Sequence, residues 1–388
     1  MNGNEHIAQG DKSTFIGMIP ETWEVRRLGD FSTFYSGGTP KSDNALYYNG
    51  HIPFIRSGEI NRDKTELFLS QEGLNNSSAK IVEEGDILYA LYGANSGQCS
   101  LSKINGAINQ AILCIRPKAD KYYIMSVLQF NKEHDYNSYL QGGQGNLSCE
   151  IVSNYKIAVP PIEEQKKIAE ILSEWDKAIE LQTKLIEKLE MRKRALMQRL
   201  LTGHVRLNGN AVEWENVRLE QIISLTKGEQ YNKVLLQKDD KYPVINGGII
   251  PSGYTDKYNS EANTITISEG GNSCGYVNLM TTRFWCGGHC YAVKEKDMVH
   301  KLFLYQLLKY HEPIIMRLRV GSGLPNIQMK TLQKYRLRIP PFPEQANIAN
   351  ILITTDREID LEKQKLSSLR TQKQGLMQQL LTGKKRFI

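Results

Sequence analysis

Three side chains with the chemistry of zinc ligands lie close together in the second half of the chain. They are Cys286, His289 and Cys290, in the segment CGGHC. A closed structural zinc site needs four ligands, and no second cluster in the sequence supplies the missing one. We therefore interpret CGGHC as strand residues around a Gly-Gly turn. The six cysteines form no CxxC pair, which favours free thiols in a reducing compartment.

The motifs of enzymes that act on nucleic acids are not found. There is no GxxxxGK[ST] phosphate loop. An adenine methyltransferase needs Asn or Asp before Pro-Pro-aromatic, whereas the apolar Val159 and Ile339 precede the two Pro-Pro pairs. Ser36-Gly37-Gly38 lacks the strand-to-helix setting of a cofactor loop, and Asp239-Asp240 is interpreted as a solvated loop rather than a metal site. The chain is expected to be non-catalytic, with no metal site.

Composition sets the broad class of protein. The 388 residues are 40% hydrophobic, enough for two ordinary globular domains, and the net charge of +7 mildly favours a polyanionic partner. No run approaches the ~18 apolar residues of a membrane span. The first residues, MNGNEHIAQGDK, lack the apolar core of a signal peptide. We therefore expect a cytoplasmic protein with no membrane contact.

An internal repeat organises the chain. Aligning residues 160–203 with residues 340–383 gives about twenty identities in forty-four positions, which indicates a tandem duplication. A shorter WExxRL element also occurs twice, at residues 23–28 and 214–219. Each half therefore begins and ends in the same way, while its middle diverges.

The repeated block has the spacing of a helix that packs on another helix. Apolar residues follow at steps of four and three from Ile168 to Leu200 and again from Ile348 to Leu380, as along a coiled-coil seam. Both seams turn polar at the same two places, Gln182 with Glu362 and Lys193 with Lys373. Polar seam positions lower stability but fix register. About forty residues at a rise of 1.5 Å predict helices roughly 60 Å long, paired antiparallel.

The intervening segments alternate short β-rich runs with Gly, Asn and Ser turns, and each has one expected helix, near residues 121–130 and 301–311. The predicted fold class is α+β. Two globular α/β domains are separated by two long antiparallel helices that form an intramolecular coiled coil with pseudo-two-fold repeat. The predicted divisions are an N-terminal extension at 1–16, a first domain at 17–155, a central helix at 156–205, a second domain at 206–335 and a C-terminal helix at 336–388.

This pattern resembles the specificity (S) subunit of type I restriction-modification enzymes. The resemblance is carried by the duplicated xPPxxEQxxIAxIL...LMQxLLTG block and covers residues 17–383. It implies two target recognition domains that read the halves of a split, asymmetric site in double-stranded DNA, with the helices as spacer. It also implies docking of two methyltransferase (M) subunits and association with restriction (R) subunits. S-adenosylmethionine, ATP and magnesium would then be bound by those partners, and this chain would carry no cofactor.

Candidate DNA contacts follow from side-chain chemistry. Arg and Lys suit guanine, Asn and Gln suit adenine, and basic or hydroxyl side chains suit phosphates. The candidates of the first domain lie in three polar loops: Arg56, Ser57, Asn95, Ser96, Gln98, Gln141, Gln144 and Asn146. Those of the second domain are Asn246, Asn272, Ser273, Arg283, Arg317, Arg319 and Asn326. The alternative for each is an ordinary turn or surface residue.

Candidate partner contacts are helix positions that recur in both copies away from the seam and are expected to be exposed. They are Glu164, Gln165, Asp176, Glu344, Gln345 and Asp356. Two equivalent docks would bind two copies of one partner. Two other functions stay open: a coiled-coil scaffold that does not bind DNA, and a stand-alone DNA methyltransferase, which the missing Asn or Asp before Pro-Pro disfavours.

Overall fold

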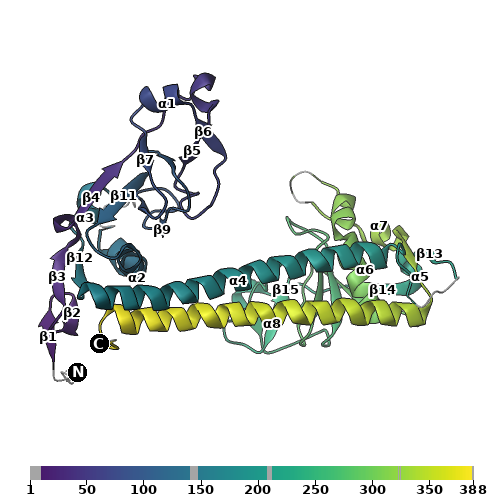
Figure 1. Cartoon of the computed structure of the whole chain (residues 1–388). Coiled ribbons are helices and arrows are strands. Elements are labelled where there is room, and N and C mark those ends of the chain that lie inside the picture. Colours follow the sequence, from purple (N-terminus) through teal and green to yellow (C-terminus); the bar gives the residue numbers. More distant parts are fainter. Residues whose placement is uncertain (1–9, 140–146, 208–211, 322, 324, 387–388) are drawn as a thin grey trace. The chain divides into compact units, whose positions relative to one another are not determined.

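The computed structural model describes residues 10–139, 147–207, 212–321, 323 and 325–386, with backbone alone for 133–139 (Figure 1). The chain divides into two compact units. The first unit comprises Met1–Gln182 and Lys365–Ile388, and the second comprises Thr183–Gln364. Each unit therefore contains one globular domain together with one half of each long helix.

The first unit is built on two four-stranded sheets. One has the order β4-β11-β8-β9, with strands at Ser32–Ser36, Ile112–Pro117, Ile87–Ala90 and Cys99–Leu101. The other has the order β6-β5-β10-β7, with strands at Leu67–Leu69, Ile52–Ile55, Gly106–Ile108 and Lys80–Val82. Two antiparallel pairs complete it: β1 (Asp11–Thr14) with β2 (Gly17–Pro20), and β3 (Glu24–Arg27) with β12 (Lys156–Val159). Its shorter helices are α1 (Gln71–Asn75), α2 (Lys121–Tyr139) and α3 (Cys149–Ser153).

The second unit repeats this plan. Its main sheet has the order β14-β20-β17-β18, with strands at Ile223–Lys227, Cys290–Glu295, Thr264–Ser268 and Val277–Met280. A smaller sheet, β16-β15-β19, comprises Tyr254–Thr255, Tyr242–Ile245 and Trp285–Cys286, and β13 (Glu215–Arg218) pairs with β21 (Arg336–Ile339). Its shorter helices are α5 (Leu219–Ile222), α6 (Lys301–Ile315) and α7 (Met329–Lys334). Short 3-10 helices in the chain lie at Leu28–Asp30, Ala45–Tyr48, Lys233–Leu235 and Met316–Leu318.

The long helices are α4 (Ile162–Leu201) and α8 (Phe342–Leu381), each of 40 residues. Pro-Pro precedes each because proline suits the first turn of a helix but not its interior. Gly203 and Gly383 follow the helices with φ of 76° and 74°, the left-handed conformation that ends a helix and favours glycine. None of the helices in the described part of the chain is long and apolar enough to cross a membrane.

Ion pairs show that α4 and α8 run antiparallel within each unit. In the first unit Asp176 binds Lys373 at 2.6 Å and Glu164 binds Arg386 at 2.9 Å. The second unit has the matching pairs, Asp356 with Lys193 and Glu344 with Arg206. Lys193 and Lys373 are the two lysines that interrupt the predicted seams. The predicted fold class, including the antiparallel helices and the repeat, is confirmed.

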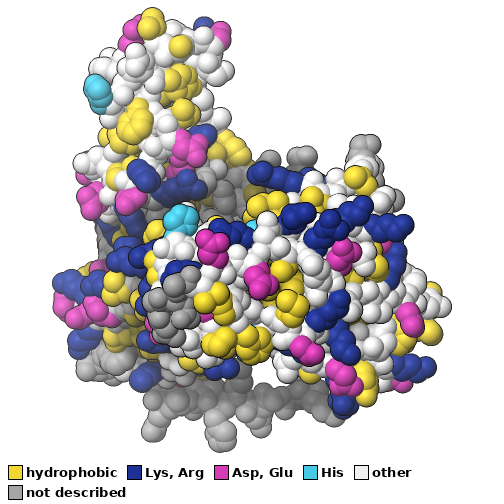
Figure 2. Space-filling view, turned by 90° about the vertical axis from the view of Figure 1, so that its right-hand side faces the viewer, with side chains coloured by type: hydrophobic (Ala, Val, Ile, Leu, Met, Phe, Trp, Pro, Cys, Tyr) yellow, Lys and Arg dark blue, Asp and Glu magenta, His cyan; other side chains and the backbone are white. Residues whose placement is uncertain are grey.

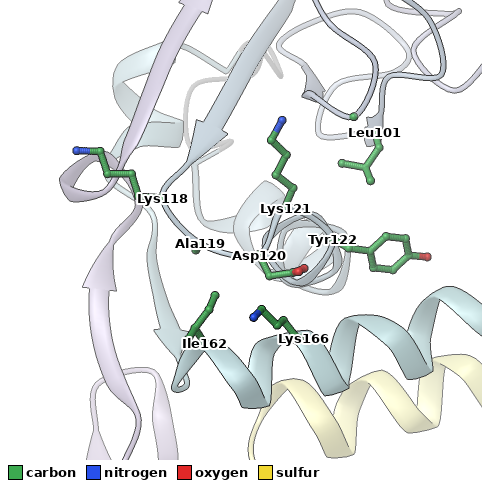
Figure 3. Close-up of a pocket in the computed structure, with 9 residues that line it drawn as sticks. Leu101, Lys118, Ala119, Asp120, Lys121, Tyr122, Ile162 and Lys166 are labelled. Carbon is green, nitrogen blue, oxygen red and sulfur yellow. The ribbon is translucent and has the colours of Figure 1, made fainter.

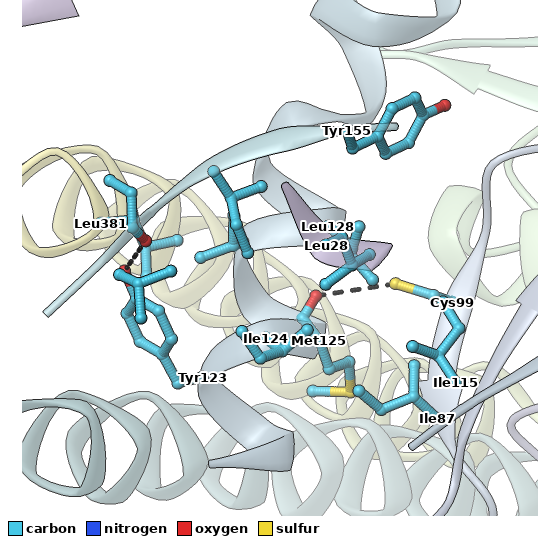
Figure 4. Close-up of a cluster of buried hydrophobic side chains, with 14 of the residues drawn as sticks. Leu28, Ile87, Cys99, Ile115, Tyr123, Ile124, Met125, Leu128, Tyr155 and Leu381 are labelled. Carbon is cyan, nitrogen blue, oxygen red and sulfur yellow. Dashed lines mark hydrogen bonds between the residues drawn. The ribbon is translucent and has the colours of Figure 1, made fainter. Parts of the chain in front are cut away.

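The core of the first unit joins the sheet to the helices. Its cluster takes side chains from β8, β11, α2 and the end of α8 (Figure 4), among them Ile87, Ile115, Leu128 and Leu381. The buried Tyr123 donates its hydroxyl hydrogen to the carbonyl of Ala158 at 2.9 Å, so its polar end is satisfied inside the cluster. Residues from the first half of the sequence and from the end of α8 therefore form one core.

Candidate nucleic-acid interface

The same tight turn occurs once in each unit, between the third and fourth strands of the main sheet. In the first unit Gly97 N donates to Ala90 O at 2.9 Å, and in the second Gly275 N donates to Ser268 O at 2.8 Å. Each turn begins with a left-handed glycine, Gly93 with φ of 81° and Gly271 with φ of 80°. These turns carry the predicted contacts Asn95, Ser96 and Gln98 of the first unit and Asn272 and Ser273 of the second, so candidate residues of both units lie on corresponding turns.

Two predicted loops of the first unit lie next to each other. A Cβ placed on Gly58, beside Ser57, would be 3.6 Å from Asn95 Nδ2. Gln98 is exposed on the same turn. Ser96 is different, because it is buried and donates its hydroxyl hydrogen to Leu91 O at 3.1 Å. The Ser96 hydroxyl therefore holds the turn, and a DNA contact at Ser96 stays a prediction that would compete with this hydrogen bond.

Arg56 is held by two acidic neighbours. It pairs with Glu59 at 3.1 Å and with Glu66 at 2.5 Å, and the hydrogen bonds that it donates to these carboxylates raise the pKa of Arg56. Burial tends to raise the pKa of Glu59, but the hydrogen bonds that it accepts outweigh this and leave the pKa lowered. Arg56 remains partly exposed, so a DNA contact there would compete with an existing ion pair.

The third predicted loop of the first unit, with Gln141, Gln144 and Asn146, lies outside the described residues. The residue that follows it is described: Leu147 N donates to Leu91 O at 2.8 Å. The second unit has the same bond, from Ile327 N to Glu269 O at 2.8 Å.

Four segments of the second unit converge. Asn246 Oδ1 accepts a hydrogen bond from His289 N at 3.2 Å, and Gly271 N donates to Pro325 O at 3.0 Å. An isolated β-bridge joins Gly270 to Asn326. The predicted contacts Asn246, Asn272, Ser273 and Asn326 thus belong to one group of loops, in which Asn272 and Asn326 are exposed.

The three predicted arginines of the second unit differ in their surroundings. Arg283 pairs with Glu261 at 2.9 Å and lies 4.7 Å from the centre of the Tyr258 ring. Arg317 and Arg319 are exposed beyond α6. Burial raises the pKa of the Cys274 thiol while the positive charge of Arg319 lowers it, which places Arg319 near the repeated turn. Figure 2 shows that Lys and Arg side chains gather in several groups on one face of the molecule, between acidic and apolar side chains.

Sequence reasoning missed a polar cluster beside these loops. Glu269 Oε1 accepts hydrogen bonds from Lys227 Nζ at 2.7 Å and Tyr291 Oη at 2.9 Å, and its Oε2 lies 3.9 Å from His289 Nδ1. Burial and the Glu269 carboxylate raise the pKa of Tyr291. The segment 286–290 is a turn between β19 and β20, as predicted, and Cys286 and Cys290 are buried. Only a strand-by-strand comparison of the two halves could have revealed the cluster.

The expectation that the six partner candidates are exposed is wrong for four of them. Glu164 accepts hydrogen bonds from Trp23 Nε1 at 3.0 Å and from Arg386, and it is 6% exposed. In the second unit Glu344 is held in the same way by Arg206 and is 1% exposed. These glutamates lie at the first turn of each helix and face the adjoining domain, so partner contact there stays a prediction and would compete with internal hydrogen bonds.

The neighbouring glutamines are buried for the same reason. Gln165 accepts from Asp120 N at 3.0 Å and donates to Pro160 O at 2.8 Å. Gln345 accepts from His300 N at 2.8 Å and donates to Pro340 O at 2.9 Å. Both therefore tie the start of a long helix to the start of α2 or α6.

Asp176 and Asp356 are partly exposed, but both are engaged within their own unit. Asp176 binds Lys373 and accepts a hydrogen bond from Tyr122, which is on α2. Asp356 binds Lys193 and accepts from Gln306 Nε2 at 2.6 Å. Partner contact at these two positions stays a prediction, and it would compete with internal ion pairs.

A pocket of about 610 Å³ lies in the first unit between the starts of α2 and α4 (Figure 3). Lys118, Lys121, Lys166, Leu101 and Ile162 contribute to its lining. None of the residues predicted from the sequence lines this pocket, so the candidate interface consists of loops and not of a cavity.

Comparison with known proteins identifies the family. The model of the type I restriction modification DNA specificity domain matches twice, at residues 20–191 and 211–371. The chain belongs to this family. Each match includes one globular domain and most of the long helix that follows it.

Relatives match over nearly the whole chain. The MjaVIII specificity subunit of a type I restriction enzyme from Methanocaldococcus jannaschii is 26% identical, covering 94% of this chain and 93% of its own length. The putative MjaX specificity subunit of the same organism is 28% identical, covering 96% of each chain. The crystal structure of an S subunit from M. genitalium shares the fold, with TM-score 0.68, 19% identity and coverage of 92% of this chain and 96% of that one. This protein is therefore a type I specificity subunit.

Proposed function

We propose that this specificity subunit recognises a bipartite, asymmetric site in double-stranded DNA, one half through the loops of each unit. The observation that carries the proposal is duplication with divergence. The main sheets of the two units have the same strand order and the same turn, but Asn95 corresponds to Ser273 and Gln98 to Tyr276. Loops of equal geometry with different hydrogen-bonding side chains suit two different base sequences.

The helices α4 and α8 would set the gap between the half-sites. Forty residues at 1.5 Å per residue give roughly 60 Å, and half-sites one turn of B-DNA apart lie about 34 Å from each other. Ion pairs at matching positions, Lys193 with Asp356 and Lys373 with Asp176, support a fixed register. A fixed register is what a spacer of defined length needs.

The catalytic steps would be carried by partners: two methyltransferase subunits with S-adenosylmethionine, and restriction subunits with ATP and magnesium. Because Glu164, Gln165, Glu344 and Gln345 are engaged internally, we place the docks elsewhere on the helices. Leu181 and Leu361 occupy matching positions of α4 and α8 and are 67% and 64% exposed. An exposed apolar side chain that recurs in both halves suits two copies of one partner.

Methylation mapping tests the DNA proposal. Genomic DNA from cells that contain this chain and its methyltransferase partner should carry a methylated motif in two parts with a constant gap. The assembled complex should bind duplexes with that motif, lose affinity when the gap changes by one base pair, and weaken steeply with salt because phosphate contacts release counterions. Salt-insensitive binding without sequence preference would favour the scaffold, and methyl transfer by the isolated chain would favour the stand-alone enzyme.

Substitution on the helices tests the docks. Leu181→Asp and Leu361→Asp should each lower the number of bound methyltransferase subunits from two to one, measured by native mass spectrometry. Lys188→Asp, a charge change at another exposed position of α4, serves as the control and should leave two bound. Unchanged stoichiometry in both leucine variants would contradict docking at these positions.

A further inference from the structure

The two halves of the chain provide an internal comparison at the polar cluster of Lys227, Glu269, His289 and Tyr291. Leu91 N donates to Ala111 O at 2.8 Å in the first unit, as Glu269 N donates to His289 O at 2.8 Å in the second. Glu269 and His289 therefore correspond to Leu91 and Ala111.

The strand registers extend this correspondence. Leu113 is paired with Ser36 in the first unit, as Tyr291 is paired with Lys227 in the second. Leu91, Ala111 and Leu113 are all buried in the first unit, so the fold is satisfied there by three apolar side chains.

The polar cluster lowers the stability of the fold, because it places a carboxylate where the first unit has an apolar side chain. Moving a carboxylate out of water is costly unless the group is fully paired. Lys227 and Tyr291 satisfy Glu269 Oε1, but the buried Glu269 Oε2 accepts no hydrogen bond within the described part of the chain. His289 Nδ1, 3.9 Å away, is positioned to supply one after a movement of about 1 Å.

His289 stands where the candidate loops meet. Its backbone N donates to Asn246 Oδ1, and a Cβ on Gly247 would come within 2.7 Å of its carbonyl oxygen. A Cβ on Gly270, which bridges to Asn326, would lie 3.7 Å from His289 Nδ1. The His289 side chain is nevertheless 62% exposed, so a ligand that approaches these loops can reach it.

We propose that His289 determines specificity in the half-site bound by the second unit, with Glu269 as its positioning residue; this rests on the proposed DNA recognition. Lys227 already pairs with Glu269 Oε1, and in the proposed contact the Nδ1 hydrogen of His289 goes to Glu269 Oε2. Nε2 is then an acceptor. Its ligand is an exocyclic amino group in the major groove, either N6 of adenine or N4 of cytosine.

The experiment uses the assembled complex and a library of randomised sites. His289→Ala should reduce the preference at one base pair of the second unit's half-site about tenfold, the effect of losing one base contact, without changing the first half-site. The identity of that base pair distinguishes adenine from cytosine. His51→Ala, at an exposed histidine of the first unit, is the control and should change no preference.

A second variant separates function from folding. Glu269→Leu with His289→Ala introduces the residue types that the first unit uses at these positions, so it should fold with an unchanged melting temperature and still lose the same base preference. The single variant Glu269→Gln should weaken the preference at that base pair and leave the preferences at all other positions unchanged.

Three results would overturn the inference. If the double variant keeps the full preference, His289 does not read a base. If affinity falls uniformly for all sequences with a shallower salt dependence, His289 contacts phosphate. If the wild-type complex shows no bipartite preference, the proposed function fails, and the inference fails with it.

Discussion

Glu344→Gln is the sharpest test of how the second unit is held to its long helix. The Glu344 carboxylate is fully buried and accepts hydrogen bonds from Arg206 Nε at 2.9 Å, Arg206 Nη2 at 2.8 Å and Leu207 N at 3.2 Å. Gln has nearly the same shape, but it keeps one acceptor oxygen and turns an N–H group towards the guanidinium. The substitution therefore removes charge and one hydrogen bond without creating a cavity.

The loss of stability caused by Glu344→Gln can be estimated from these contacts. Losing one charge-assisted hydrogen bond costs about 1.5–3 kcal/mol, and removing one partner of a buried ion pair costs about 3–5 kcal/mol. We expect the lower part of that range, about 3 kcal/mol, because 25% of the Arg206 side chain is exposed and can be rehydrated. Since 1.4 kcal/mol is tenfold in an equilibrium constant, the start of α8 should open roughly a hundredfold more often.

Hydrogen exchange followed by mass spectrometry is the appropriate assay, because a chain with two units need not unfold in one step. Peptides from the first turns of α8 should lose protection in Glu344→Gln. Glu358→Gln is the matched control on the same helix. Glu358 and its partner Arg192 are both exposed, so we expect Glu358→Gln to lower stability by less than about 0.5 kcal/mol. Equal protection in the two variants would refute the reasoning.

The pH dependence of stability provides a second test of the Glu344–Arg206 ion pair. Burial tends to raise the pKa of Glu344, but the hydrogen bonds from Arg206 and Leu207 N outweigh it, so the folded-state pKa lies below the ordinary value of 4.5. A carboxyl with a lowered pKa stabilises the fold fully above its ordinary pKa and loses this contribution as the pH falls through the folded value. The wild type should therefore exceed Glu344→Gln in stability at pH 7, and the difference should shrink below pH 4.5.

Three further results are expected. Lys193→Asp should lower the stability of the second unit by about 1–2 kcal/mol, and adding Asp356→Lys should restore more than half in a double-mutant cycle; no recovery would contradict the ion pair as a source of stability. Gly271→Ala should destabilise by about 1–2 kcal/mol because φ is +80°, whereas Gly375→Ala, inside α8 with free space around it, should stabilise by about 0.5–1 kcal/mol; denaturant titration that gives both the same sign would contradict this. Cys149, an exposed thiol, should be alkylated before the buried cysteines, and simultaneous modification in the native protein would contradict the burial found here.

The sequence was informative where one physical pattern extends over many residues. Apolar spacing over forty positions predicts α4 and α8, and the proline and glycine signals predict their ends. The two shorter helices begin at Lys121 and Lys301, where they were expected, but extend to Tyr139 and to Ile315, and the second of them continues past Pro313. Repetition carried most of this success, since each half supported the interpretation of the other.

Individual side chains could not be placed in the same way. Glu164 and Gln165 recur in both halves and are polar, which suggests a surface, yet they are buried because they connect helix to domain. The sequence shows that a residue recurs but not which neighbour it faces. The proximity of His289 to Glu269 was missed for a related reason: it depends on strand pairing between segments that show no joint pattern.

The division of the chain into units has a consequence for synthesis. The second unit is one continuous stretch, Thr183–Gln364, so all of its residues are synthesised before Lys365. The first unit needs Lys365–Ile388, and its core includes Leu380 and Leu381 packed with Trp23. The domain made first must therefore wait until residues 365–388 have been made, and in the interval its apolar surface is open to chaperones or to mispairing with another nascent chain.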